Sequence, residues 1–185
     1  MFIQTEQTPN PATLKFLPGR DVVSKGVVDF TDPEQAQASP LARRVFAVEG
    51  VTGVFLGTDF VTVTKATGED WYALKPAVLG AIMEHFLSGD PVLEPDAGLA
   101  EEAAPREDED ELVKQIRELI DTRVRPAVAQ DGGDIIFRGF ERGVVYLHMR
   151  GACSGCPSST ITLKNGIENL LRYYVPEVVE VRSVV

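Results

Sequence analysis

Cysteine is scarce in this chain, because only two of its 185 residues are cysteines, Cys153 and Cys156. Two thiols close at most one disulfide, which excludes the dense disulfide framework of small secreted domains. Basic residues are also in deficit, since 18 lysines and arginines stand against 28 aspartates and glutamates. The resulting net charge of −10 gives no electrostatic support for binding nucleic acid.

Long apolar runs are missing as well. No stretch approaches the ~20 consecutive apolar residues of a membrane-spanning helix, so we expect no membrane insertion. The first residues, MFIQTEQTPNPATLKF, show neither a basic segment before an apolar run nor an arginine-rich transit peptide. We therefore expect a reducing bacterial cytosol, with a processed mitochondrial form as the alternative. In a reducing compartment, a CxxC pair is more often metal-binding or redox-active than structural.

The composition changes sharply over residues 91–107, which hold five acidic residues, one basic residue and three prolines. Such a segment is typical of a solvated spacer kept extended by self-repulsion, and a docking site for a basic partner is the alternative. We predict two small domains, residues 1–90 and 108–185, joined by a flexible acidic linker over 91–107. Each domain is expected to combine a small sheet with two helices, so that the fold class is mixed α/β (α+β).

Turn and cap signals place the elements of the first domain. Prolines between two extended runs favour strands, and Ser39 before Pro40 indicates a helix start. Gly89 is expected to end the last helix. The predicted order is strand FIQTEQ, strand TLKFLPG, helix SPLARRVFAV, hairpin VTGVFLGTDFVTVTK and helix WYALKPAVLGAIMEHFLSG.

The second domain has the predicted order α-β-β-α-β. Apolar residues at helical spacing mark a first helix, which Pro126 is expected to end or kink. In the second strand of the hairpin, Val145, Leu147 and Met149 share one face. The elements are helix DEDELVKQIRELIDTRVRPAVAQ, strands DIIFRGF and VVYLHMR, a helix that Pro176 stops, and strand VVEVRSV.

Both cysteines lie in the loop GACSGCPSST, between the end of a strand and the start of a helix. The positive end of that helix is expected to lower the thiol pKa values. Thiolates suit a soft metal, and both zinc and iron–sulfur sites normally take four ligands. One chain cannot supply four thiolates, and its only histidines are His85 and His148. Two copies related by a two-fold axis can supply them, and a cluster so shared would be easily released, as a carrier requires.

Two other functions compete for the same cysteine pair. One is a thiol–disulfide oxidoreductase, although CSGC lacks a preceding aromatic residue and a βαβ start upstream. The other is a zinc-bridged dimer with a structural role. Asp131 and Asp134 flank Gly132-Gly133 and are expected to serve turns and caps instead of forming a paired-carboxylate site. No Ser-His-Asp arrangement, P-loop or GxGxxG motif is present, so we expect no enzyme.

Two segments resemble a known family. RPAVAQDGGDI (125–135), followed by a hairpin and by GACSGCPSSTITLKNGIENLLRYYVPEV (151–178), closely resembles the NifU-type C-terminal domain of the Nfu family. QTPNPATLKFLPG (7–19) resembles the N-terminal domain of Nfu proteins. The resemblance implies an iron–sulfur scaffold or carrier in which Cys153 and Cys156 ligate a [4Fe–4S] cluster across a homodimer, with [2Fe–2S] left open. It also implies loading by upstream cluster-assembly proteins, delivery to apo iron–sulfur proteins, and partner recognition by the N-terminal domain.

Overall fold

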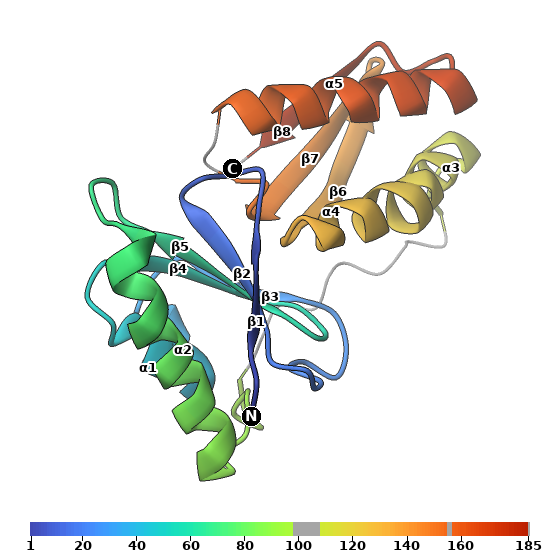
Figure 1. Ribbon diagram of the computed structural model, residues 1–185. Helices are drawn as coiled ribbons and strands as arrows, with labels where there is room; N and C mark the ends of the chain where they lie inside the picture. Colours follow the sequence, from blue (N-terminus) through green and yellow to red (C-terminus); the bar gives the residue numbers. More distant parts are fainter. Residues whose placement is uncertain (98–107, 155–156, 185) are drawn as a thin grey trace. The chain divides into compact units, whose positions relative to one another are not determined.

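The structure is a computed structural model, and it describes residues 1–97, 108–154 and 157–184 (Figure 1). The chain divides into two compact units, Met1–Leu99 and Ala100–Val185. Each unit has its own sheet and its own helices, so the predicted mixed α/β class is confirmed. Within the described ranges, no helix is both long enough and apolar enough to cross a lipid bilayer.

The N-terminal unit is built on a five-stranded antiparallel sheet in the order β1-β2-β5-β4-β3. The predicted strand pair and hairpin are confirmed, and a short strand, β3, is added beside β4 (Figure 1). The elements are β1 (Gln4–Gln7), β2 (Thr13–Leu17), β3 (Val28–Phe30), η1 (Gln35–Ala38), α1 (Pro40–Phe46), β4 (Val51–Leu56), β5 (Val61–Lys65) and α2 (Trp71–Ser88).

The core of this unit lies between the sheet and the helices α1 and α2. Phe16 of β2 and Leu56 of β4 are fully buried there, together with Leu41 of α1 and Val78 and Ile82 of α2. Burial of each such side chain contributes about 1.5–3 kcal/mol to folding. The two helices are fixed at their ends as predicted: the Ser39 hydroxyl accepts a hydrogen bond from the N–H of Ala42 at 3.0 Å, and Gly89 follows α2 with a φ of 78°.

The first residues of the predicted linker pack against this unit. The carbonyl of Val92 accepts a hydrogen bond from the Ser39 hydroxyl at 2.5 Å, and Leu93 packs against the core. Glu94 forms an ion pair with Arg43 at 3.0 Å. The composition of 91–107 does not reveal these contacts. Residues 98–107 lie outside the described residues.

His85 is a buried polar residue of α2. Its side chain is fully buried, and neither ring nitrogen has a hydrogen-bond partner in the part of the chain that is described. Burial is the main cause that lowers the pKa of His85; the charge of Arg44 also lowers it, and Asp90 acts in the opposite direction. The fold therefore accommodates the neutral imidazole.

We predict that acid destabilises the N-terminal unit through His85. Because the pKa of His85 is lower in the folded chain, the unfolded chain takes up a proton first when the pH falls below about 6.5, and stability is lost below that pH at up to about 1.4 kcal/mol per pH unit. Urea unfolding followed by the fluorescence of Trp71, the single tryptophan, should show this loss. The His85→Leu variant should show a weaker pH dependence, and an equal one would contradict the prediction.

The C-terminal unit has the predicted order α-β-β-α-β, with its first helix divided in three. β6 and β7 pair antiparallel as a hairpin, and β8 pairs parallel to β7 after the crossover through α5. The elements are α3 (Glu111–Leu119), the π-helical turn η2 (Ile120–Val124), α4 (Arg125–Gln130), β6 (Gly133–Glu141), β7 (Val144–Gly151), α5 (Pro157–Tyr174) and β8 (Glu180–Val184).

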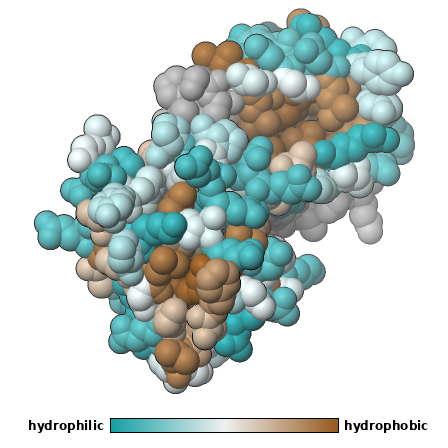
Figure 2. Space-filling view, in the orientation of Figure 1, coloured by the Kyte–Doolittle hydropathy of each residue, from teal (hydrophilic) through white to brown (hydrophobic). Residues whose placement is uncertain are grey.

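The helices of this unit cover one face of the three-stranded sheet. Val145, Leu147 and Met149 of β7 are buried on that face, as their alternation predicts, and Ile120 and Leu171 pack on them from the helical side. Figure 2 shows apolar side chains gathered between α3 and α5. The interruption predicted at Pro126 takes the form of the π turn before it, and Pro126 lies in the first turn of α4, where its missing N–H costs little.

Candidate functional site

The cysteine loop begins where β7 ends, at Gly151. The N–H of Cys153 donates to the carbonyl of Arg150 at 3.3 Å. The hydroxyl of Thr160, in α5, donates to the carbonyl of Cys153 at 3.3 Å. These bonds fix Cys153 between the end of the strand and the helix, as the sequence predicts. Cys156 lies outside the described residues.

The pair Gly132-Gly133 packs directly against this loop. Gly132 has a φ of 80°, which favours glycine, and its carbonyl accepts a hydrogen bond from the N–H of Ala152 at 3.2 Å. Gly133 opens β6 opposite Gly151. A Cβ added at Gly133 would lie 2.4 Å from the Sγ of Cys153 and 2.9 Å from the backbone oxygen of Arg150. Only glycine fits at this position without moving the cysteine loop.

Gly133→Ala should therefore destabilise the C-terminal unit by about 1–3 kcal/mol, the usual cost of overpacking a filled interior. Urea unfolding followed by the NMR amide signals of β7 measures this cost. Gly139→Ala, in the same strand, is the matched control because an added Cβ there meets no atom within 4 Å. Equal destabilisation by the two variants would show that the contact with Cys153 is not the cause.

Cys153 is buried, with 6% of its surface exposed, and its side chain belongs to the core of the unit. Burial raises the pKa of the Cys153 thiol to about 12, and the charges of Asp131 and Asp134 act in the same direction. The expectation that the following helix lowers this pKa is therefore wrong for Cys153. Burial removes the thiolate from water and so disfavours the charged form of the side chain.

The buried Asp134 forms an ion pair with the half-buried Arg125, which the sequence did not predict. Both of its carboxylate oxygens accept hydrogen bonds from the guanidinium of Arg125, each at 2.9 Å. Asp131 takes the C-cap position of α4, as expected, so the two carboxylates have different structural roles. Both Arg125 and Asp134 lie in the segment RPAVAQDGGDI, which carries the family resemblance and is the one sequence signal that could have indicated the pair.

The two histidines belong to helix and strand elements outside the cysteine loop. His85 lies in the N-terminal unit, within α2. His148 is half-buried on β7, and its Nδ1 lies 3.2 Å from the carbonyl oxygen of Val184; burial is the main cause that lowers its pKa. Among the described residues, no three of histidine, cysteine, aspartate and glutamate come together in a group that could hold a metal ion.

Two family models match the chain, one for each unit. The model described as the scaffold protein Nfu/NifU N terminal matches residues 3–89, and the NifU-like domain matches residues 116–182. The mitochondrial NFU1 iron-sulfur cluster scaffold homolog of Homo sapiens is 52% identical over the whole chain, which covers 72% of that protein. The chain belongs to the Nfu family.

A second relative agrees with the Nfu assignment, and one solved structure has a related sequence. The NFU1 homolog of Drosophila erecta is 55% identical over the full 185 residues. The chain spans 65% of the length of that protein, slightly less than two thirds. The solution structure of a NifU-like protein from Saccharomyces cerevisiae is 27% identical, with a TM-score of 0.44, and the match covers 52% of this Nfu chain and 87% of the yeast chain.

The names of these relatives correct the predicted location. The expected bacterial cytosol is contradicted, because the Drosophila and human Nfu proteins are named mitochondrial. The prediction depended on the first residues of the sequence, whereas this chain spans only part of the length of its relatives.

Proposed function

We propose that this Nfu chain is a scaffold and carrier for iron–sulfur clusters. Two copies hold one [4Fe–4S] cluster through Cys153 and Cys156 of each copy, and they pass it to apo iron–sulfur proteins by stepwise exchange of thiolates at iron. The cluster is the cargo of the protein, and no catalytic turnover is involved. In this proposal the unit of residues 108–185 holds the cluster, and the unit of residues 1–90 recognises partners.

The number of sulfur donors is the observation that carries this proposal. The whole chain has two cysteines, which is half of what a four-ligand site takes. Thiolates are the donors that iron–sulfur clusters use, so the chemistry of the pair fits the cargo. A second copy of the same chain is the simplest source of the other two thiolates, because two-fold dimers are the commonest homo-oligomers.

The environment of Cys153 supports a metal-binding role over a redox role. A thiol–disulfide oxidoreductase needs a thiolate near neutral pH, whereas the Cys153 thiol is buried and its pKa is raised to about 12. A bound metal deprotonates a coordinating thiol by its own charge, so a raised pKa does not prevent ligation. Ligation in a shared site further requires that the Cys153 sulfur become accessible at the surface.

Anaerobic reconstitution with ferrous iron and sulfide tests the proposal. The wild-type chain should turn brown and elute as a dimer, and Cys153→Ser and Cys156→Ser should each lose the colour and the dimer. Ser183→Ala, at an exposed position of β8, is the control that should retain both. A cluster on a monomer without an added thiol would contradict the proposal. Stoichiometric zinc without iron would favour the structural dimer, and a reversible disulfide without metal uptake would favour the oxidoreductase.

A further inference from the structure

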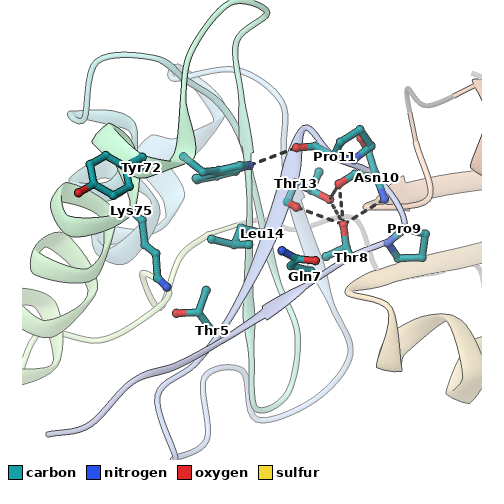
Figure 3. A pocket seen from close by; sticks show the side chains of 11 residues that line it. Thr5, Gln7, Thr8, Pro9, Asn10, Pro11, Thr13, Leu14, Tyr72 and Lys75 are labelled. Atoms are coloured by element: carbon teal, nitrogen blue, oxygen red, sulfur yellow. Dashed lines mark hydrogen bonds between the residues drawn. The ribbon is translucent and has the colours of Figure 1, made fainter.

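A pocket of about 560 Å³ opens in the N-terminal unit, beside β1 and the first turns of α2. Figure 3 shows how its labelled side chains are arranged. Thr5 and Gln7 come from β1, Leu14 comes from β2, and Tyr72 and Lys75 come from α2. The pocket lies in the unit without cysteine, so the cluster site does not account for it.

The segment TPNP, between β1 and β2, forms a fixed end of this pocket. The Thr8 hydroxyl donates to the carbonyl of Asn10 at 2.8 Å, and the Asn10 side-chain oxygen accepts from the N–H of Ala12 at 3.0 Å. The indole N–H of Trp71 donates to the carbonyl of Pro11 at 3.2 Å, which joins the turn to the start of α2. A turn bonded in this way holds β1 and α2 at a defined spacing.

β1 lies at the edge of the sheet, because among the described strands it pairs with β2 alone. Thr5 and Gln7 pair with Phe16 and Leu14, so they lie on the face that α2 covers. Within the described residues, the outer backbone groups of β1 have no strand beside them. An edge strand next to a helix is a geometry that accepts an extended peptide as an added strand.

Lys75 gives this pocket its charge. It is the only charged side chain that lines the pocket, and it has no ion pair with any residue in the described part of the chain. Figure 3 shows Lys75 extending from α2 toward Thr5 of β1. Leu14 adds an apolar floor, and Tyr72, 92% exposed, adds an uncovered aromatic ring at the helix.

We propose that this pocket, together with the outer edge of β1, binds an extended segment of a partner protein. The backbone of the segment adds to the outer edge of β1, and an aspartate or glutamate side chain of the segment pairs with Lys75. The inference deepens the partner-recognition role proposed for the N-terminal unit and rests on that role, but it does not depend on the cluster.

The probe is a display library of short random peptides selected on the immobilised full-length chain, with the affinity of recovered peptides measured by fluorescence anisotropy. Recovered peptides should share an acidic position, and Lys75→Glu should weaken their binding by about tenfold or more, the loss expected for a charged contact. Lys75→Arg should retain most of the affinity. Lys25→Glu, an exposed lysine of the same unit, is the matched control and should change little.

NMR amide shifts locate the bound peptide. Shifts should concentrate on β1 and on the first turns of α2, with contacts between the peptide backbone and the outer edge of β1. The proposal is overturned if the library yields no binding peptide, if Lys75→Glu and Lys25→Glu weaken binding equally, or if the shifts lie elsewhere. None of these measurements uses iron, so their failure would leave the cluster proposal unaffected.

Discussion

In a Cys156→Ser variant, Cys153 should react with an aromatic disulfide reagent about a hundredfold more slowly than a free cysteine at neutral pH. Raising the thiol pKa from about 8.5 to about 12 lowers the thiolate population roughly 3,000-fold. The more basic thiolate is a better nucleophile, and this raises the reaction rate of each thiolate by only about 40-fold. The small exposed fraction of the side chain, 6%, slows the reaction further.

The release of the coloured thiolate from the reagent gives the rate, first in buffer and then in urea, where Cys153 should reach the rate of a free cysteine. The reference is Ser183→Cys in a chain with both natural cysteines replaced by serine, because residue 183 is exposed on β8 of the same unit. If Cys153 reacts in buffer as fast as that reference, its burial does not persist in solution. The argument against a redox function would then fail as well.

Local signals in the sequence predicted most of the secondary structure. The alternation of Val145, Leu147 and Met149 identified the buried face of β7, and Ser39 and Gly89 marked helix ends that the structure confirms. These features depend on residues a few positions apart, whose geometry the backbone fixes. β3 was missed because a strand of three residues offers too short a pattern to recognise.

Features of the site that depend on distant residues were not predictable in this way. Gly133 and Cys153 meet because β6 pairs with β7, and no local pattern states how close the two residues approach. The pKa of Cys153 was predicted with the wrong sign, because the helix was visible in the sequence and the burial was not. The packing of Val92 and Leu93 on the N-terminal unit was likewise hidden by the acidic composition around them.

Arg125→Met should destabilise the C-terminal unit by about 3 kcal/mol, the low end of the usual cost of removing one partner of a buried ion pair, because Arg125 itself is only half-buried. The side chain of Asp134 is 5% exposed and that of Arg125 is 23% exposed, so the substitution leaves a carboxylate buried without its cation. Asp134 lies next to Gly133, which contacts Cys153, so the loss should also loosen the cysteine loop. Amide signals of β6 and β7 report the unfolding of this unit, while Trp71 reports independently on the other one.

Two further variants separate the buried charge from general surface effects. Lys114 pairs with Glu111 at 3.5 Å, with side chains 42% and 91% exposed, so Lys114→Met should cost about 1 kcal/mol or less. Combining Arg125→Met with Asp134→Leu should recover part of the stability, because no charge then remains buried. If the double variant is as unstable as Arg125→Met alone, the loss comes from the packing of the arginine stem. If Arg125→Met costs no more than Lys114→Met, the ion pair does not stabilise the site.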